Sequence, residues 1–483
     1  MSNLPQGLEV INIGLRSFAD SIQAAGGSVL HVAWRPPADG DVTVGRALAR
    51  LMNDERIETA NRTAFEAFLS ARPTLVDVRP ARELIPDFAR RLISHAGPPI
   101  GWERMCGPMR GAVIGAILFE GWADDPEGAV RLADSGQIAF APCHHYGAVG
   151  PMAGIISPSM PLWVVANAAG QNQAFSGLNE GLGRVLRYGA YGPEVLGRLK
   201  WMSATLGPML GAALRATGGI ELKPLMAQSL QMGDELHNRN VAASSLLLKQ
   251  LIQGLLLSGE SASEILQAVQ FIAGNAHFFL NVSMAACKAM LDAAHGIANS
   301  SLVTAMARNG VEFGVRVSGT GDGWFTAPAP EVKGLYFPNY GPNDASRDLG
   351  DSAITETAGF GAFAMATAPA IVKFVGGTRA DADANTGLMR RITAGPHPDF
   401  LIPSLDFIGI PSLIDARKVV DRSIVPIINT GIAHRDPGVG QVGAGICDAP
   451  VACFISALTA LGQQVAASVR YHAVDAVAGR ESG

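Results

Sequence analysis

Apolar and polar positions change their period along the chain, and these changes mark the elements that the sequence predicts. An apolar run at 8–15 and another at 29–34 flank an amphipathic stretch at 17–25. Two apolar runs joined by one short helix are typical of a β-α-β unit with parallel strands. A long helical pattern at 44–69 and a further strand follow. The sequence therefore predicts a small Rossmann-like α/β domain over 1–105.

The rest of the chain divides into three segments by pattern. Residues 106–180 alternate strands with glycine-rich loops, whereas residues 181–310 show helical spacing of apolar positions. Within the helical segment, the leucine-rich stretch 246–257 indicates a helix buried on most sides. Residues 311–483 combine strands with helices. The predicted fold class is α/β, α+β overall, with an N-terminal Rossmann-like domain, a central mostly helical domain and a C-terminal mixed α+β domain.

A polar island, QMGDELHNRN at 231–240, interrupts the central helical pattern. On a helix, Asp234, His237 and Asn238 would share one face, and Glu235 and Arg239 would share the neighbouring face. Ionisable groups in apolar surroundings are costly unless they are paired or used in function. This island is therefore the leading candidate for an active site. The alternative is a solvated helix end with an ion-pair network.

Further polar groups stand around the ends of the helical segment. Asn240 closes the first island, Asn275 and His277 lie in a second island, GNAHFFLN, and Arg308 and Arg316 follow it. Each of these groups alone is more often a helix cap or a satisfied core group. Several of them in one region favour a shared site.

Three loops carry the remaining candidates. His434, Arg435 and Asp436 stand together in a glycine-rich stretch after a strand. Arg110 lies in the first turn of a helix, where free backbone N–H groups can hold a phosphate or a carboxylate, or simply start the helix. Adjacent histidines, His144 and His145, follow another strand as parts of a ligand loop. Neighbouring side chains of an extended chain point to opposite faces, so this pair favours no metal ion.

Glu356 lies in a small-residue helix start, ITETAGFGA, where it can act as a general base or as a carboxylate of the first turn. The first predicted β-α turn has no G-x-G-x-x-G pattern, so a dinucleotide site has little support. We predict no metal and no cofactor.

Composition limits the classes of function. The net charge of -5 gives no electrostatic case for nucleic acid. Charged residues make up only 16%, which indicates surfaces covered by partners or subunits. The five cysteines show no C-x-x-C spacing, which fits a reducing cytoplasm better than a disulfide framework. The start of the chain has no signal-peptide pattern, and the apolar runs are too short to predict a transmembrane helix.

Five stretches give the chain a family resemblance: INIGLRSFADSIQAAGGSVLHVAWRPPADGD, QMGDELHNRN, GNAHFFLN, VRVSGTGDGWF and NTGIAHRDPGVGQVGAG. With them the chain resembles the YlbE/YahG-like (AllG-type) family over almost its whole length. That family, formerly a domain of unknown function, is linked to oxamate carbamoyltransferase of allantoin and purine breakdown. The resemblance implies a subunit that acts with an FdrA-like partner, itself similar to a succinyl-CoA synthetase subunit, and with a third small protein.

The implied reaction joins oxamate and carbamoyl phosphate to give oxalurate and phosphate, and catabolism runs it backwards. Such chemistry needs cations for the anions, donors for an oxyanion and a base for the amide nitrogen. The candidates for binding the anions are Arg239, Arg308, Arg316 and Arg435, and those for the oxyanion donors are Asn238, Asn240 and Asn275. The candidate base is His237, oriented by Asp234, or His434, oriented by Asp436. Glu235 lies beside the pair of His237 and Asp234.

The chain lacks the S-x-R-T phosphate loop of ordinary transcarbamylases, and its nearest stretch, Gly376–Arg379, is a poor match. Either the chemistry evolved on another fold, or a partner holds the phosphate. Two other classes stay open. One is a ligase or acyl-phosphate enzyme that works with the CoA-synthetase-like partner, through His237 or His434 as a phosphohistidine. The other is a non-catalytic scaffold subunit. In each case we expect a homo- or hetero-oligomer and no membrane contact.

Overall fold

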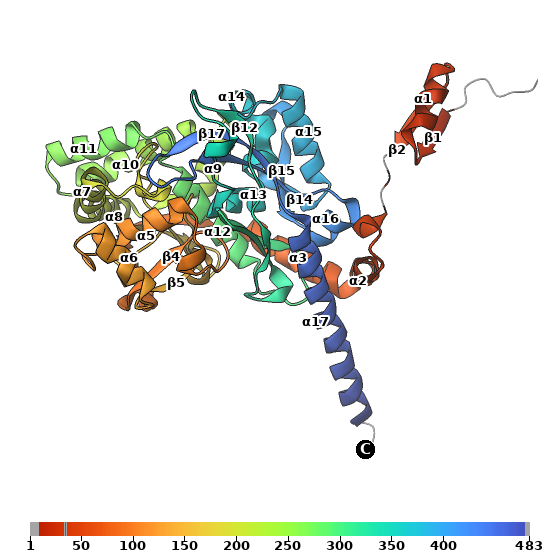
Figure 1. The fold of residues 1–483 in the computed structure, drawn as a ribbon, viewed down its shortest axis with the longest axis horizontal. Coiled ribbons are helices and arrows are strands. Elements are labelled where there is room, and N and C mark those ends of the chain that lie inside the picture. Colours follow the sequence, from red (N-terminus) through yellow and green to blue (C-terminus); the bar gives the residue numbers. More distant parts are fainter. Residues whose placement is uncertain (1–8, 33, 35, 479–483) are drawn as a thin grey trace, which may run out of the picture.

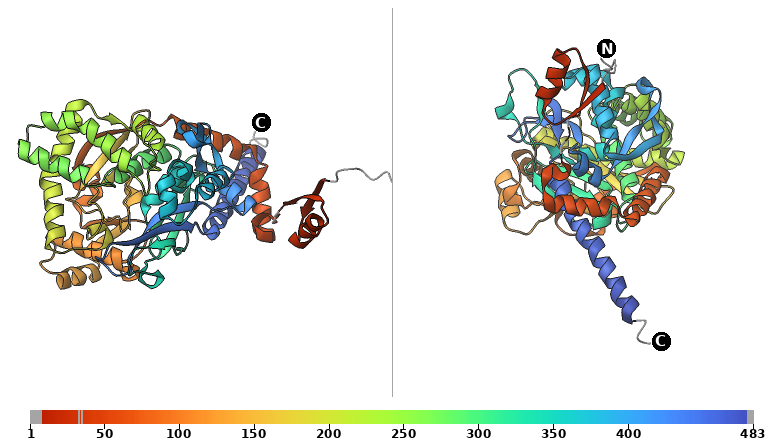
Figure 2. Two further views of the ribbon diagram at one scale, coloured as in Figure 1. Left: turned by 90° about the horizontal axis from the view of Figure 1, so that it is seen from above. Right: turned by 90° about the vertical axis from the view of Figure 1, so that its right-hand side faces the viewer.

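The computed structural model describes residues 9–32, 34 and 36–478. Figure 1 shows a mixed α/β body, an N-terminal unit that lies outside it, and a C-terminal helix that projects from it. The two further views in Figure 2 show the same arrangement. Among the described helices, none has both the length and the apolar character that a membrane crossing requires.

The N-terminal unit is the predicted β-α-β unit, with β1 (Glu9–Ile13), α1 (Arg16–Ala24) and β2 (Ser28–Val32). The two strands are parallel, as the short crossover predicts. A Rossmann-like domain over 1–105 is not confirmed, because β3 (Pro73–Pro80) pairs antiparallel with β6 (Pro161–Asn167) instead of extending this sheet. Leu8 lies outside the described residues.

The helical pattern at 44–69 contains two helices, α2 (Val42–Met52) and α3 (Glu55–Ser70). Between them the Asp54 carboxylate accepts from the backbone N–H of Arg56 at 2.9 Å and starts the second helix. The chain then enters an antiparallel sheet of order β7-β6-β3-β8, whose other strands are β7 (Gln173–Gly177) and β8 (Ile220–Glu221). The short helix α4 (Ala81–Leu84) follows β3.

A parallel pair, β4 (Leu92–His95) and β5 (Ala139–Pro142), forms a second small α/β unit with α5 (Gly107–Phe119) and α6 (Pro126–Asp134). Helix α5 begins at a Gly-Pro pair, as predicted, because proline has no N–H to lose in a first turn.

The central segment is mostly helical, as predicted. Its helices are α7 (Pro193–Trp201), α8 (Gly207–Thr217), α9 (Leu222–Gln231), α10 (Val241–Leu257), α11 (Ala262–Ala273) and α12 (Leu280–Ala293). The interpretation of 246–257 as a helix buried on most sides is wrong: Leu256 and Leu257 are 69% and 61% exposed. The buried helix is α12, which packs against β6, β7, α3 and α13 (Ile354–Ala358).

The helical segment ends earlier than predicted. Residues 303–309 form strand β9 (Val303–Asn309), which pairs antiparallel with β10 (Glu312–Val317). The turn between them contains Asn309 and Gly310, and Gly310 has a φ of +79°. Asn-Gly is a frequent hairpin turn pair, because both residues tolerate a positive φ. That pair is the sequence signal for the two strands.

The C-terminal segment forms three further sheets around the same body. Their orders are β11-β10-β9-β13, β12-β17-β16 and β14-β15. The remaining strands are β11 (Phe325–Pro328), β12 (Lys333–Tyr336), β13 (Leu349–Gly350), β14 (Thr393–Ile402), β15 (Ile408–Ile414), β16 (Ile427–Ala433) and β17 (Gln441–Asp448). The remaining helices are α14 (Pro369–Phe374), α15 (Arg379–Arg390), α16 (Ala416–Arg422) and α17 (Val451–Ala478).

Candidate active site

The island at 231–240 is not a helix. Helix α9 ends at Gln231 and α10 begins at Val241. Between them Gly233 and Leu236 have φ values of +91° and +68°, which are left-handed and incompatible with a right-handed helix. The expected helical faces are therefore wrong. The loop nevertheless buries Asp234, Glu235 and His237.

The central contact of the site is between His237 and Glu356, which are far apart in sequence. The imidazole Nδ1 lies 2.8 Å and 2.9 Å from the two carboxylate oxygens of Glu356. His237 is 3% exposed, and Glu356 is fully buried on α13. A carboxylate at this distance accepts from an N–H at Nδ1, which leaves Nε2 as the basic nitrogen. Nε2 of His237 makes no hydrogen bond to the described residues.

Glu356 is held by donors from three segments. Its oxygens accept from the backbone N–H groups of Ala362 at 3.1 Å and Asn429 at 3.3 Å, and from the hydroxyl of Thr355 at 3.0 Å. Gly361 approaches so closely that a Cβ there would overlap Oε1 of Glu356. The carboxylate is therefore fixed in place before any ligand binds.

Glu235 braces the loop from within. Its oxygens accept from the backbone N–H groups of His237 at 2.8 Å and Arg239 at 2.6 Å, and its own carbonyl accepts from Gly361. Burial raises the pKa of Glu235 to about 7, the charge of His237 lowers it, and that of Glu356 raises it. The loop thus contains a carboxyl that changes its charge near neutral pH.

Asp234 supports helix α10 and does not contact His237. Its carboxylate accepts from the backbone N–H of Ala243 at 2.9 Å and forms an ion pair with Arg239 at 3.2 Å. Burial raises the pKa of Asp234, and the N–H groups at the helix start lower it. Glu356, which the sequence left open between two roles, takes the orienting contact proposed for Asp234. The Arg239 side chain is 36% exposed and lies at the rim.

Polar groups without partners gather around this pair. In the described chain, the buried atoms Nδ2 of Asn238, Oδ1 of Asn240, and both Oδ1 and Nδ2 of Asn429 make no hydrogen bond. Asn429 is fully buried, and its backbone N–H is the one that reaches Glu356. Unmet buried donors and acceptors are rare in folded proteins and costly. Their concentration here indicates a site that a polar ligand completes.

A cavity of about 270 Å³ lies beside the loop, and its wall includes Asn238, His277, Phe337 and Gln441. Burial lowers the pKa of His277 to about 4, and the charges of Arg187 and His237 lower it further. His277 is therefore neutral at pH 7 and offers one donor and one acceptor. Asn275 accepts from the backbone N–H of His277 at 3.0 Å, so it is connected to this wall through His277.

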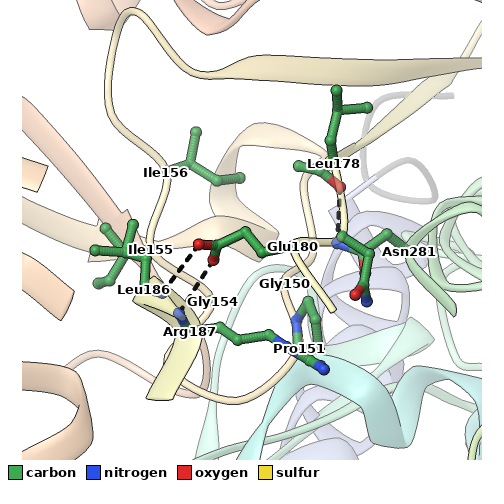
Figure 3. A pocket seen from close by; sticks show the side chains of 12 residues that line it. Gly150, Pro151, Gly154, Ile155, Ile156, Leu178, Glu180, Leu186, Arg187 and Asn281 are labelled. Atoms are coloured by element: carbon green, nitrogen blue, oxygen red, sulfur yellow. Dashed lines mark hydrogen bonds between the residues drawn. The ribbon is translucent and has the colours of Figure 1, made fainter. Parts of the chain in front are cut away.

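A second cavity, of about 50 Å³, is lined in part by Glu180, Arg187 and Asn281, as Figure 3 shows. The side chain of Asn179 donates to Asn281 at 2.7 Å and accepts from Asn275 at 3.4 Å, so an amide network joins the two cavities. The sequence analysis missed Asn179, Glu180 and Arg187. Their signal is the glycine-rich, polar stretch NEGLGRVLRYG, which follows β7.

Arg308 lies close enough to Glu356 for their charges to interact, but its own charge is paired with Asp348. Its guanidinium meets Asp348 through two bonds, of 2.7 Å and 2.9 Å, and also donates to Gly350 and Thr430. Arg308 is fully buried. This arrangement holds β9, β13 and β16 together and leaves no free charge for a substrate.

His144, His145 and Arg316 form a separate polar cluster. Nε2 of His144 lies 3.6 Å from Asp351, whose pKa burial raises to about 7. His145 accepts from Trp324 at 3.0 Å, while Arg316 pairs with Asp322 and lies 3.1 Å from His295. The structure does not bring these three residues to His237.

The remaining candidates, on the loop after β16 and in the first turn of α5, make no hydrogen bond or ion pair with His237 or Glu356 within the described chain. Asp436 is exposed, and its backbone N–H donates to Nδ1 of His434 at 2.9 Å, while Arg435 uses its backbone to reach Asp344. Arg110 stacks on Trp102 at 4.0 Å and donates to its carbonyl, so its charge faces an aromatic ring. Across the described ranges there is no group of three or more metal-ligating side chains.

These features define a class of protein: a mixed α/β subunit with a buried carboxylate–imidazole pair beside a polar cavity. Residues 138–352 match the family model described as oxamate carbamoyltransferase subunit AllG. The chain is 47% identical to the oxamate carbamoyltransferase subunit AllG of Escherichia coli K12 over 412 residues. The matched region covers 85% of this chain and 98% of that relative. The chain belongs to this AllG family.

Two other relatives are similar to the chain over most of its length. The uncharacterized protein YahG of Escherichia coli K12 is 46% identical over 456 residues, 94% of this chain and 97% of YahG. A crystal structure of a conserved protein of unknown function from Enterococcus faecalis V583 superposes with a TM-score of 0.84, at 47% identity, over 85% of this chain and 98% of that one. The family resemblance inferred from the motifs is confirmed, and a transferase subunit is the class of protein that it indicates.

Proposed function

We propose that this chain is the subunit of an oxamate carbamoyltransferase that supplies the proton-transferring centre. The enzyme joins oxamate and carbamoyl phosphate to oxalurate and phosphate, and allantoin breakdown uses the reverse reaction. The observation that carries this proposal is the His237–Glu356 pair, placed among unmet polar groups in a chain of the AllG family. A scaffold subunit has no need of a buried, unsatisfied polar centre.

In the forward direction, Nε2 of His237 takes a proton from the oxamate amide. The amide nitrogen forms a bond to the carbamoyl carbon, the bond from that carbon to the phosphate oxygen breaks, and phosphate leaves with the electron pair. Glu356 stabilises the imidazolium that results, since its carboxylate faces Nδ1. In the reverse direction His237 returns the proton to the amide nitrogen while phosphate attacks the carbamoyl carbon.

The remaining groups of this site stabilise charge. Asn238, Asn240 and Asn429 have unmet hydrogen-bond groups for a carbonyl that becomes an oxyanion. Arg239 stands at the rim for the phosphate, although its charge is shared with Asp234. Glu235 keeps the loop in shape through two backbone contacts.

The relative's name as a subunit supports a complex, and an FdrA-like chain is the partner that we propose. The N-terminal unit fits this proposal, because it exposes large apolar side chains: Ile11, Ile13, Leu15, Phe18 and Leu30 are each more than 60% exposed. Parallel sheets are normally covered on both faces, and a two-stranded sheet is marginal alone. A phosphate site on the partner would also account for the missing S-x-R-T loop.

The test is phosphate-dependent breakdown of oxalurate, measured as oxamate and carbamoyl phosphate. The chain is assayed alone and with the FdrA-like and third subunits, as wild type and as His237→Gln, Arg239→Ala and the exposed control Arg79→Gln. We expect the wild-type complex to be active, His237→Gln to lose this activity and Arg239→Ala to lose part of it. The control Arg79→Gln keeps the wild-type activity. Full activity of an assembled His237→Gln complex would contradict the proposal. Turnover that requires CoA would point instead to the ligase class.

A further inference from the structure

The small cavity of about 50 Å³ has both an acidic and a basic side chain in its wall. Gly150, Pro151 and Gly154 bring the backbone close to it, and Glu180, Arg187 and Asn281 supply the polar groups (Figure 3). A water needs about 10–15 Å³ of such volume, so the cavity has room for roughly four waters. That is the size of a very small polar molecule.

Arg187 has unused donors at this cavity. The residue is 7% exposed, and its Nε and Nη2 donate to one acceptor, the carbonyl of Gly181, at 3.2 Å and 2.7 Å. Nη1 has no hydrogen bond within the described chain, and no carboxylate forms an ion pair with Arg187 there. The Glu180 carboxylate is near enough for its charge to interact with that of Arg187, but the two side chains do not form a direct ion pair. A nearly buried guanidinium with no carboxylate in direct contact is stabilised when an anion binds to it.

Glu180 adds an acceptor to the same wall. Its oxygens accept from the backbone N–H groups of Leu186 at 3.0 Å and Arg187 at 3.4 Å, which anchors the carboxylate beside the arginine (Figure 3). Each oxygen keeps a second lone pair. The wall therefore offers both a cation that needs an anion and a carboxylate that accepts from N–H groups.

The cavity also lies close to the proton-transferring centre. Arg187 and His237 both act on the pKa of His277, and Asn281 belongs to the amide network that reaches Asn275. Asn281 is itself fixed, because its Nδ2 donates to the carbonyl of Gly177 at 2.7 Å. A small ligand held here lies at the edge of the site that contains His237.

We infer that this cavity binds the acceptor, a small carboxylate that also carries a primary amide, with the carboxylate on Arg187 and the amide N–H on Glu180. This inference rests on the proposed function, and it names the two residues that select the acceptor. Oxamate has both groups. Oxalate and phosphate have no amide N–H to donate, and their second negative charge meets the Glu180 carboxylate.

The experiment measures binding to the purified full-length chain by calorimetric titration with oxamate, oxalate and inorganic phosphate. The variants are Arg187→Gln, Arg187→Lys and Glu180→Gln, with the exposed neighbour Arg184→Gln as the matched control. We expect the wild type and the control to bind oxamate more tightly than oxalate or phosphate. Arg187→Gln weakens oxamate binding by about 10- to 100-fold, because a charge-assisted pair is lost. Arg187→Lys recovers part of it.

Glu180→Gln is the sharper test, because it changes preference and not only affinity. The glutamine side chain donates from its NH₂ group where the carboxylate only accepts. The ratio of oxalate to oxamate affinity therefore rises in this variant. The inference is overturned if the wild type binds oxamate no better than oxalate. It is also overturned if the ratio of oxalate to oxamate affinity is unchanged in Glu180→Gln, or if folded Arg187→Lys and Arg187→Gln keep the wild-type affinity for oxamate.

Failure of this inference is distinguishable from failure of the proposed function. If the complex breaks down oxalurate while the Arg187 variants keep the wild-type KM for oxalurate and affinity for oxamate, the acceptor lies elsewhere and the transferase stands. If oxamate binding depends on Arg187 and Glu180 but no complex transfers a carbamoyl group, the cavity is an oxamate-binding site and the reaction is a different one.

Discussion

The buried ion pair of Arg308 with Asp348 and the buried pair of His237 with Glu356 differ in how far their surroundings satisfy hydrogen bonds. Arg308 donates to both carboxylate oxygens of Asp348, and the carbonyl of Gly350 and the hydroxyl of Thr430 accept from its other N–H groups. Around His237, the pair with Glu356 stands among asparagine atoms without partners. Both centres are equally buried, so burial alone does not separate a structural centre from a functional one.

The two centres differ in what replaces the hydrogen bonds to water that their polar groups lose on burial. At Arg308 the folded chain itself compensates the lost hydration, so the centre contributes to holding the strands together. At His237 the compensation is incomplete until a ligand arrives, which is typical of binding sites. Unmet hydrogen-bond groups are therefore the better guide to function here than charge or depth.

Breaking the satisfied centre has the largest expected effect. Asp348→Asn leaves the Arg308 charge buried without a counterion and lowers the free energy of unfolding by about 3–5 kcal/mol. Urea denaturation measures it. Glu312→Gln, which breaks the exposed pair with Arg104, is the control and costs at most about 1 kcal/mol. If the two variants cost the same, the comparison between the centres fails.

Breaking the unsatisfied centre affects activity more than stability. Glu356→Gln keeps the shape of the side chain but removes the charge that stabilises an imidazolium at His237. We expect kcat/KM of the assembled enzyme to fall by about 10²- to 10⁴-fold. The amide NH₂ group cannot accept from the donors that hold the carboxylate, so the free energy of unfolding also falls, by about 1–3 kcal/mol. Glu83→Gln, on the surface, is the control, and a wild-type rate in Glu356→Gln would be a clear contradiction.

The pH dependence of stability sharpens the comparison. The folded pKa of Glu235 is raised from 4.5 to about 7, so the folded state holds its proton more tightly than the unfolded state does. The contribution of Glu235 to stability is therefore fully present below the unfolded pKa and is lost as pH rises from about 4.5 to 7, by about 3 kcal/mol. Glu235→Gln has no such proton. Urea denaturation between about pH 5 and 8 should show a flatter slope in this variant, whereas an identical slope refutes the assignment.

The smallest expected effect tests how Glu356 is held. Gly361 has a φ of +58°, and a Cβ there overlaps the Glu356 carboxylate. Gly361→Ala should cost about 1–3 kcal/mol of stability and reduce activity as well. Gly387→Ala is the matched control, because its Cβ meets nothing within 4 Å on helix α15. Denaturation and the oxalurate assay together measure both effects. An active, stable Gly361→Ala chain would show that the carboxylate tolerates displacement.

The sequence predicted many elements correctly where local pattern and partners agree. The β-α-β unit lies close to its predicted position, and Arg110 lies in the first turn of helix α5, as predicted. The errors arose where local pattern is ambiguous. The apolar run at 303–309 reads equally as strand or helix, and only pairing with β10 decides it. Likewise β3 is a strand as expected, but its antiparallel partner follows it by more than eighty residues.

The same division holds for the site. Clustered polar residues in apolar context marked His237, Asn238 and His277 from the sequence alone, because burial of such groups requires a reason. The sequence analysis named Asp234 as the residue that orients His237, since near neighbours in sequence are the obvious candidates, and it did not connect Glu356 with His237. The positive φ at Gly233 and Leu236 turns the loop away from helical geometry and removes that choice.

By itself the sequence determined the family, the mixed α/β class and the polar islands, because apolar periodicity and motifs are local properties of the chain. The tertiary structure alone decided which islands meet. It brought Glu356 to His237, paired Arg308 with Asp348, and left the asparagines around His237 without partners. The physical reason is that side-chain pairing across 40 to 119 residues depends on how the sheets and α12 pack, and local pattern does not encode that packing.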